Sequence, residues 1–66
     1  MNFAQAFALI LLGRKVRRLD WNRPLYVSLV NYGKTTFVHM VMNNGVNGPY
    51  SPSHCDMLAN DWVEFR

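Results

Sequence analysis

The first strongly apolar stretch of the chain, residues 3–12, is rich in strong helix formers. Asn2 can cap its start, and Gln5 stands three residues later at the reciprocal position of a capping box. Gly13 follows the stretch, where a glycine commonly ends a helix. Apolar residues surround almost all of this predicted helix, so we expect one face to pack on a sheet and another to meet a second copy of the chain. A helix of one protomer with a few exposed leucines is the simpler alternative.

Two segments rich in β-branched and aromatic residues, 25–30 and 35–42, follow this helix and predict strands. Before them, residues 14–19 are expected to form a short strand with Val16 facing inward. Turn residues separate them at 20–24 and 31–34, and the second of these turns joins two strands as a hairpin. The sheet is therefore expected to be small and antiparallel.

The strand at residues 35–42 is apolar on both faces. A sheet with one wet face would alternate more clearly between apolar and polar residues. We therefore expect the first helix on one side of the sheet and another copy of the chain on the other. His39 is expected to be partly buried and hydrogen-bonded rather than a base or a ligand. One face carries Phe37, His39 and Val41, and the other carries Val38, Met40 and Met42.

Several local signals agree in the closing segment. Ser51 is a good N-cap residue, and Pro52 suits the first position of a helix. Asp56 lies near the helix start, where a negative charge interacts favourably with the helix dipole. Asn60 can end the helix because Asn tolerates the left-handed conformation. We therefore expect a second helix of about two turns here.

This short helix is expected to direct Met57 and Leu58 inward and to lead into a terminal strand that begins at Trp62. The turn-rich residues 43–49 are expected to form a loop before it. The predicted fold class is α+β. It comprises a small antiparallel sheet, an N-terminal helix packed on it and a short C-terminal helix before the last strand.

Length and composition limit the organisation of the chain. Its 66 residues make one domain, 1–66, and half of them are apolar. A core this small is barely stable by itself. Cys55 is the only cysteine, which excludes a disulfide within the chain, and one cysteine with two histidines argues against a structural zinc site. An oligomer that shares its core is therefore expected.

The apolar run at the N-terminus is too short to span a bilayer. Positive charges follow it rather than precede it, which is the reverse of a signal peptide. A cytoplasmic location is expected. The formal net charge is +3, and four of the seven basic residues lie within 14–18. This basic run is either a solvated strand or a patch for phosphate.

Catalysis has little support in the sequence. It contains no nucleophile elbow, phosphate-binding glycine loop or metal-ligand spacing. His54 and Cys55 are neighbours, and adjacent residues of a helix point about 100° apart. Asp56 and Asp61 are explained as a helix-start acid and a turn acid. We therefore predict that the protein is not an enzyme and has no catalytic residue, metal or cofactor.

Binding has better support. Aromatic rings offer stacking surfaces, arginines suit phosphate, and small polar and acidic side chains suit hydroxyl groups and base edges. Trp21 is either such a stacking ring or a lid over the edge of the core. Together these residue types favour a nucleotide-like ligand over a peptide or a lipid. The candidate ligand-binding residues are Phe3, Arg18, Trp21, Asn22, Arg23, Tyr26, Tyr50, Ser51, Ser53, Asp56, Asp61 and Trp62.

A resemblance to a known family rests on motifs along nearly the whole chain. They are Asn2-Phe3 with Ala6, Gly13-Arg14-Lys15-Val16 with Arg18, Trp21-Asn22, Ser51-Pro52-Ser53, Asp56-Met57-Leu58-Ala59 and Asp61-Trp62. The closing motif is the most specific. In these motifs the chain resembles the second type of the Thoeris anti-defence sponge family, which consists of small phage and prophage proteins.

The resemblance implies a protein that sequesters cyclic ADP-ribose-type signals, made by bacterial TIR-domain proteins, without cleaving them. Cyclic oligonucleotides are a second implied class of ligand. It also implies a homo-oligomer, a dimer or a tetramer, with ligand held between protomers. On this hypothesis the rings of Trp21 and Trp62 stack on or frame the ligand. Asp56 and Asp61 would accept hydroxyl or amine donors, and Arg18 and Arg23 would meet the pyrophosphate.

Two other functions stay open. The basic run at 14–18 would suit nucleic acid, although Asp56, Asp61 and Glu64 near the expected site weigh against that partner. An exposed apolar surface would suit a protein inhibitor that caps a host enzyme. No membrane partner is expected.

Overall fold

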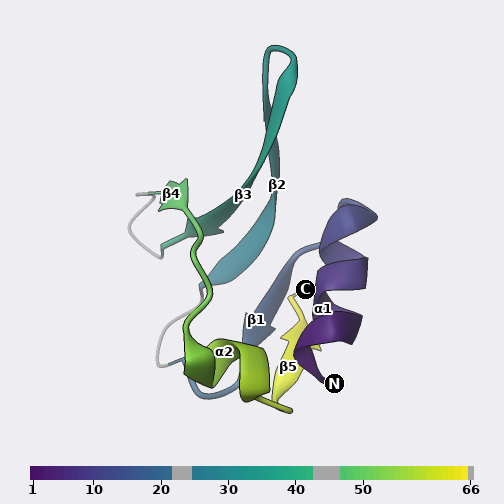
Figure 1. The fold of residues 1–66 in the computed structure, drawn as a ribbon, viewed down its shortest axis with the longest axis vertical. Helices are drawn as coiled ribbons and strands as arrows, with labels where there is room; N and C mark the ends of the chain where they lie inside the picture. The colour runs from purple at the N-terminus through teal and green to yellow at the C-terminus, as the bar shows by residue number, and fades with distance from the viewer. Residues whose placement is uncertain (22–24, 43–46, 66) are drawn as a thin grey trace.

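A computed structural model describes residues 1–21, 25–42 and 47–65. In these residues a five-stranded antiparallel sheet, with strand order β4-β3-β2-β1-β5, carries two helices (Figure 1). The α+β class and the order of the two helices relative to the strands agree with the prediction. In chain order the elements are α1 (Phe3–Leu11), β1 (Val16–Arg18), β2 (Tyr26–Tyr32), β3 (Thr35–Val41), β4 (Asn47–Pro49), α2 (His54–Leu58) and β5 (Trp62–Glu64).

Helix α1 has the capping box that the sequence predicts. The backbone N–H of Gln5 donates to Oδ1 of Asn2 at 2.9 Å, and the backbone N–H of Asn2 donates to Oε1 of Gln5 at 3.0 Å. Gly13 follows the helix with a φ of 86°, a backbone conformation that other residues rarely adopt. Ala6 and Ile10 lie one helical turn apart and are the buried residues of this helix.

The core lies where α1 covers β1, β2 and β5. Val16 of β1 pairs with Val27 of β2, and both are fully buried beside Ala6 and Ile10. Trp62 of β5 is also fully buried and is the largest residue of this cluster. Because β5 pairs with β1, the closing segment of the chain lies beside the first strand. The core therefore depends on both ends of the chain.

Strands β2 and β3 form a long hairpin that projects from the rest of the molecule (Figure 1). Their ladder continues to the pair Tyr32 and Thr35, so the turn contains only Gly33 and Lys34. Gly33 has a φ of 61°, which suits the first central position of a two-residue hairpin turn. The predicted turn at 31–34 was therefore two residues too long. Asn31 and Tyr32 remain in the ladder because the glycine permits so tight a turn.

The predicted loop at 43–49 contains an unpredicted strand, β4. Met40 of β3 pairs with Gly48 of β4, which places β4 at an edge of the sheet. Glycine and proline in this segment hide the strand from sequence analysis, but an edge strand tolerates both. Residues 43–46, like residues 22–24 of the preceding predicted turn, lie outside the described part of the chain.

Helix α2 begins later than predicted. Its N-cap is Ser53 rather than Ser51, and Oγ of Ser53 accepts the backbone N–H of Asp56 at 3.2 Å. Pro52 therefore precedes the helix. The C-cap is Ala59, in an extended conformation with a ψ of 150°, so Asn60 does not end the helix. With Ser53 as the N-cap, Asp56 stands in the first turn of the helix, where its negative charge interacts favourably with the helix dipole.

The expectation that Met57 and Leu58 point inward was wrong for the single protomer. Met57 is 44% exposed and Leu58 is 81% exposed. Asp56 takes the buried position of this five-residue helix instead. The next two residues are rotated by about 100° and 200° from it, and so they face away from the core.

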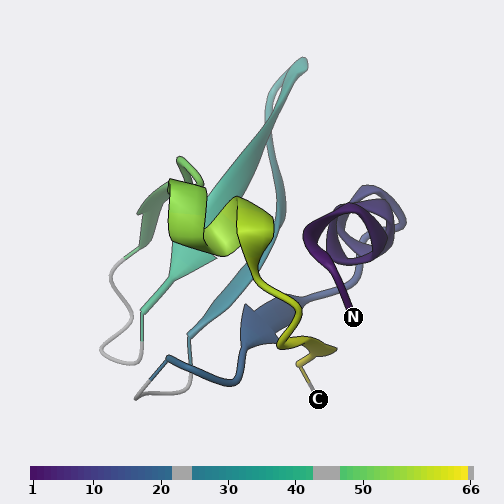
Figure 2. The same ribbon diagram turned by 60° about the horizontal axis from the view of Figure 1, so that its bottom comes forward.

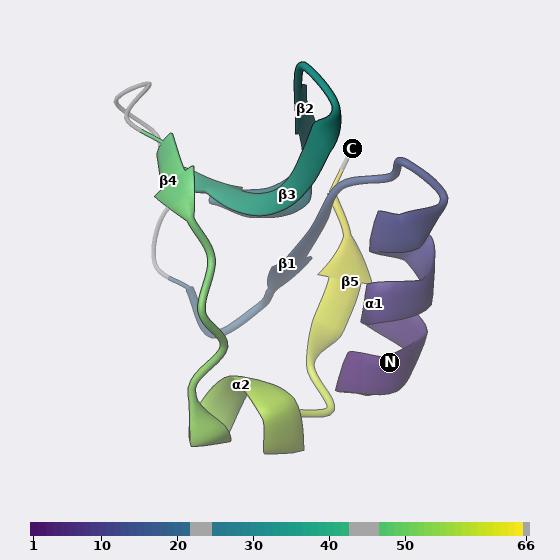
Figure 3. The same cartoon turned by 45° about the horizontal axis from the view of Figure 1, so that its top comes forward.

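Both helices lie on one side of the sheet. They contact each other, and Figures 2 and 3 show α1 and α2 on either side of the strand that ends the chain. Antiparallel pairing places paired residues on the same face. The predicted grouping of Phe37, His39 and Val41 on one face of β3 therefore holds, and this is the face opposite the helices.

His39 is buried, at 7% exposure, but the expected hydrogen bond is missing at one nitrogen. Within the described residues, Nδ1 of His39 has no hydrogen-bond partner. Its ring lies between those of Tyr32 and Phe37, with centroids 5.5 Å and 6.0 Å away. Packing against rings buries His39 without giving its Nδ1 a hydrogen-bond partner.

Candidate functional site

The candidate site is organised around the carboxylate of Asp56, which is 8% exposed. Nη1 of Arg18 donates to Oδ1 of Asp56 at 3.0 Å, and the hydroxyl of Tyr50 donates to Oδ2 at 2.8 Å. Arg18 lies at the end of β1, and Tyr50 follows β4. Each oxygen of this buried carboxylate therefore has a partner from a different element.

The backbone of Asp56 makes one hydrogen bond within its own helix and one to β5. Its N–H donates to the N-cap side chain of Ser53, and its carbonyl accepts Nε1–H of Trp62 at 2.9 Å. A buried tryptophan needs a partner for this N–H, and α2 supplies one. One residue thus ties together β1, the segment after β4, α2 and β5. We call Arg18, Tyr50, Asp56 and Asp61 the charged network.

Arg18 joins Asp61 to this network. Its Nε donates to Oδ1 of Asp61 at 2.8 Å, and Oδ2 of Asp61 accepts the backbone N–H of Asp20 at 3.0 Å. Nη2 of Arg18 lies 3.9 Å from a carboxylate oxygen of Asp20. The planar guanidinium, with donors on several sides, can contact separate carboxylates where a lysine could not.

The network fixes the protonation states of Arg18, Asp61 and Tyr50. The hydrogen bonds that Arg18 donates to Asp61 and Asp56 raise the pKa of Arg18, and the hydrogen bond from Arg18 lowers the pKa of Asp61. Burial, followed by the hydrogen bond to Asp56, raises the pKa of Tyr50. At neutral pH, Arg18 is therefore a cation, Asp61 an anion and Tyr50 a neutral donor.

Aromatic rings flank the network on the helix side. Trp62 lies at the centre, with the ring of Phe3 at 5.7 Å and the ring of Trp21 at 5.4 Å in an edge-on arrangement. Trp62 has no exposed surface, whereas Phe3 and Trp21 are half-buried. In one protomer, a ligand can reach Phe3 and Trp21 but not the ring of Trp62.

The structure brings together most of the predicted ligand-binding residues and separates one. Tyr26 lies on the opposite face of the sheet, where its ring is 5.0 Å from that of Phe65. Asn22 and Arg23 lie outside the described residues. The residues gathered on the helix side, on or beside the charged network, are Phe3, Arg18, Trp21, Tyr50, Ser51, Ser53, Asp56, Asp61 and Trp62. Their roles toward a ligand remain predictions.

Sequence analysis missed that Arg18, Asp56 and Asp61 are partners of one another. It also missed Asp20, whose backbone contributes to the same cluster. Arg18 lies 38 residues from Asp56 and 43 residues from Asp61, so no local pattern indicates these pairs. The arginine in the short first strand and the two aspartates beside Trp62 were the available signals.

Two general features of the described residues bear on the kind of site. No group of three or more His, Cys, Asp or Glu side chains in this part of the chain is placed to hold a metal ion. Among the helices of the described residues, none is long and apolar enough to cross a membrane.

The fold and the charged network define a small α+β domain with a preorganised polar site at the junction of its two helices and its sheet. Residues 1–65 match the family model of the Thoeris anti-defense 2-like domain. The chain therefore belongs to this family, which confirms the resemblance found in the sequence. Among curated proteins, none matches the chain.

Proposed function

We propose that this protein binds a cyclic ADP-ribose-type signalling molecule in the bacterial cytoplasm and sequesters it without cleavage. The single observation that carries the proposal is the match of residues 1–65 to a family named for its action against Thoeris defence. Cyclic oligonucleotides are a second class of signal within the proposal. Removing the signal would keep the defence effector inactive.

The charged network supports recognition of a sugar-containing ligand. Ribose hydroxyl groups need acceptors, and the side chains of Asp61 and Asp20 are 30% and 77% exposed. The network holds Asp61 in place before a ligand arrives, which lowers the entropy cost of binding. Arg18 already contacts two carboxylates, so a pyrophosphate would share its guanidinium with them. The ring of Trp21 lies 5.4 Å from that of Trp62, and its proposed role is to frame a base.

The protonation states support binding without cleavage. A general acid or base works best when its pKa lies near the working pH. The hydrogen bond from Arg18 lowers the pKa of Asp61, and burial raises the pKa of Tyr50. Both shifts move the pKa values of these groups away from neutral pH. Asp61 and Tyr50 are therefore suited to fixed hydrogen bonds rather than to proton transfer.

The size of the ligand supports a site shared between copies of the chain. Nanomolar binding requires about −12 kcal/mol. A ligand of about 35 non-hydrogen atoms, at roughly −0.3 kcal/mol per atom, reaches near −10 kcal/mol. Such a ligand must be almost fully enclosed. Leu19, Met57 and Leu58 are exposed close to the charged network, and we propose that they pack against a second copy to form a dimer or a tetramer.

The proposal is tested by recovery of the signal. The protein is mixed with cyclic ADP-ribose, the bound fraction is separated, the protein is denatured by heat, and the filtrate is assayed. We expect intact ligand in an amount that matches the bound fraction. Recovery of linear ADP-ribose instead would show that the protein is an enzyme.

A matched pair of ring substitutions locates the site. Trp21→Leu removes a ring beside the network, whereas Tyr32→Leu removes a ring at the far end of the hairpin. Calorimetry should show at least tenfold weaker binding for Trp21→Leu and unchanged binding for Tyr32→Leu. Equal effects would place the ligand elsewhere.

The shared interface has a separate test. Leu58 is 81% exposed in the protomer, so Leu58→Ser should leave the protomer folded. Sedimentation should show a lower oligomer mass for this variant than for the parent protein, together with weaker ligand binding. If the parent protein sediments as a monomer at micromolar concentration, the proposal of a site shared between copies is wrong.

A further inference from the structure

Strand geometry divides the basic run at residues 14–18 between the two sides of the sheet. Arg14 and Arg18 contact acids, with Nη1 of Arg14 2.7 Å from Glu64 and Nε of Arg18 2.8 Å from Asp61. Arg17 pairs across the ladder with Val63, on the face opposite the helices. Nζ of Lys15 lies 4.7 Å from the ring centroid of Tyr26 on this same face. Alternate side chains of a strand point to opposite faces, so one basic run makes two different surfaces.

The face of the sheet opposite α1 and α2 carries cations and rings without acids. The chain has four acidic residues. Asp20, Asp56 and Asp61 gather around Arg18, and Glu64 pairs across the ladder with the core residue Val16. We call the opposite surface the helix-free face. Its cations and aromatic side chains are Lys15, Arg17, Tyr26, Tyr32, Phe37, His39 and Phe65.

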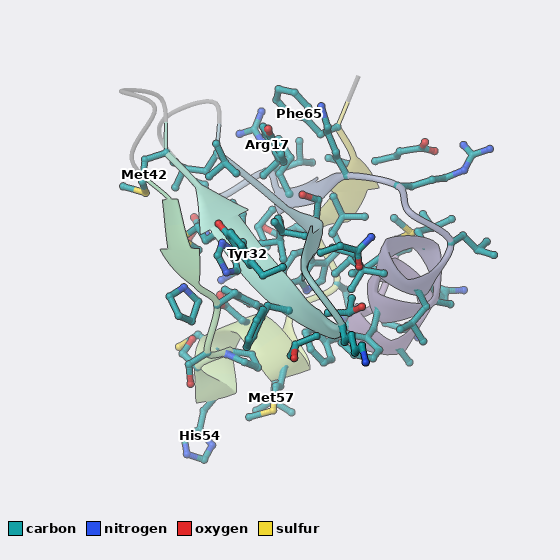
Figure 4. The ribbon with its side chains drawn as sticks, turned by 90° about the horizontal axis from the view of Figure 1, so that it is seen from above. Arg17, Tyr32, Met42, His54, Met57 and Phe65 are labelled. Carbon is teal, nitrogen blue, oxygen red and sulfur yellow. The ribbon has the colours of Figure 1, made fainter. Side chains whose placement is uncertain are left out.

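The rings of the helix-free face form two clusters. Tyr26 and Phe65 lie 5.0 Å apart with their planes 32° from each other. At the other end, Tyr32 and Phe37 lie 5.9 Å apart and are 54% and 42% exposed. Figure 4 shows Phe65 close to Arg17, on the side of the molecule remote from α2. Rings that lie beside cations, as Tyr26 does beside Lys15, are typical of surfaces that stack bases and contact phosphates.

Two buried polar atoms on the helix-free face have unused hydrogen-bonding capacity. Within the described residues, Nε of Arg17 and Nδ1 of His39 have no hydrogen-bond partner. The same arginine donates through Nη2 to the carbonyl of Trp21 at 2.9 Å, which holds its guanidinium in place. Buried polar groups are nearly always paired, so unpaired ones need an explanation. Because both atoms are buried, a phosphate or a base edge could pair with them only after the side chains above them shift.

We infer that the helix-free face binds single-stranded nucleic acid. The rings stack bases, and Lys15 and Arg17 contact the backbone phosphates. A second copy of the chain suits this face less well, because a two-fold interface would pair the face with itself and set Lys15 and Arg17 against a surface that has no acid. This site lies across the sheet from the charged network and does not depend on the proposed function.

The separation of the two ring clusters indicates a polymer rather than a single nucleotide. Tyr26 and Tyr32 are six residues apart on β2, which is roughly 20 Å at about 3.3 Å per residue. At about 3.4 Å per nucleotide along a stacked strand, this distance corresponds to about six nucleotides. A mononucleotide can occupy one cluster only. Affinity should therefore rise with length up to at least this size.

The test measures fluorescence anisotropy of labelled oligothymidylates of 3, 6, 12 and 20 nucleotides at several salt concentrations. We expect binding to strengthen by at least tenfold between the 3-mer and the 12-mer. A duplex of 20 base pairs should bind more weakly than the 20-mer single strand, because its bases are not free to stack. Saturating cyclic ADP-ribose should leave the anisotropy unchanged.

Two double variants with the same change in net charge form the matched comparison. Lys15→Gln with Phe37→Ser alters the helix-free face, whereas Arg14→Gln with Leu11→Ser alters the helix side. The first pair should weaken binding of the 20-mer by about tenfold or more through the lost stacking. It should also reduce the slope of log affinity against log salt by about 0.7, the value for one lost phosphate contact on a single strand. The second pair should leave affinity within about twofold.

Three results would overturn the inference. Equal losses in both double variants would mean that net charge alone attracts the oligonucleotide. Displacement by cyclic ADP-ribose would place the oligonucleotide in the site on the helix side. A lower oligomer mass for the variant of the helix-free face, with unchanged affinity, would make a second copy the occupant. Because cyclic ADP-ribose binding is measured separately, failure here leaves the proposed function in place.

Discussion

The two helices begin in the same way but are held by different forces. Each has a side-chain N-cap, Asn2 for α1 and Ser53 for α2. Helix α1 has nine residues and buries Ala6 and Ile10 in the apolar core. Helix α2 has five residues, and its buried residue is Asp56. Apolar burial thus places one helix, and a charged network places the other.

This difference indicates how each helix tolerates change. Apolar packing is non-directional, and its strength follows the area that is buried. A buried carboxylate is stable only while its partners remain in place. Helix α1 should therefore tolerate conservative apolar substitutions, whereas α2 should depend on the identity of a few polar atoms. Four predictions test this contrast, from the largest expected effect to the smallest.

Asp56→Ala should have the largest effect. It leaves Arg18 with one carboxylate fewer and the hydroxyl of Tyr50 without its acceptor. Breaking a buried ion pair costs about 3 kcal/mol, and an orphaned hydroxyl costs about 1 kcal/mol more. Urea denaturation should thus show a free energy of unfolding lower by about 4 kcal/mol. Tyr50→Phe is the control and should lose about 1 kcal/mol. If Asp56→Ala loses less than the about 1 kcal/mol expected for Tyr50→Phe, the network does not hold α2.

Ile10→Ala should follow closely. Ile10 is 1% exposed, and its truncation removes buried surface and leaves a cavity, at a cost of about 3 kcal/mol. Leu11 is the matched control, because it is 60% exposed on the same helix and Leu11→Ala should change stability by less than about 0.5 kcal/mol. If Ile10→Ala and Leu11→Ala lower the free energy of unfolding equally in urea denaturation, burial of Ala6 and Ile10 does not hold α1 on the sheet.

Removal of the two N-caps should have a smaller effect. Asn2→Ala and Ser53→Ala each delete an acceptor for a backbone N–H at a helix start. Each should cost about 1 kcal/mol in the free energy of unfolding. Replacement by Gly, which is tolerated at N-caps, should lower the free energy of unfolding by only about 0.3 kcal/mol. If Ser53→Ala has no effect, the charged network alone sets the start of α2.

Acid should weaken the charged network through protonation of Asp61. The pKa of Asp61 is lowered in the folded protein by its hydrogen bond from Arg18, whereas an unfolded aspartate has a pKa of about 3.9. The stabilisation is therefore complete above about pH 5 and is lost as the pH falls through the lowered pKa. The measurement is urea denaturation of the parent protein and Asp61→Asn at pH 7, 5 and 3. The difference between them should narrow at pH 3, and a constant difference would contradict an ionised Asp61.

Much of the fold was accessible from sequence because its signals are local. The capping box at Asn2 and Gln5, the positive φ at Gly13 and the alternation along β3 each depend on residues a few positions apart. The start of α2 was missed because Ser51 and Ser53 are both good caps. The strand β4 was missed because its residue types favour turns, and only pairing with β3 makes it a strand.

The candidate site was only half accessible for the same reason. Residue types identified Arg18, Asp56 and Asp61 as binding groups, but not as partners of one another. Tyr26 was grouped with them although it lies on the opposite face of the sheet. The sequence does not show which face of a sheet an aromatic residue occupies until the pairing of its strand is known.

The amino-acid sequence alone determined the α+β class, the limits of α1, the hairpin and the family. These follow from short-range capping, side-chain alternation and motif spacing. Only the tertiary structure decided which charges meet, since Arg18 lies 38 and 43 residues from its two aspartates. It also decided that one basic run faces two surfaces. The pairing of distant strands sets both outcomes, and a local pattern carries no information about that pairing.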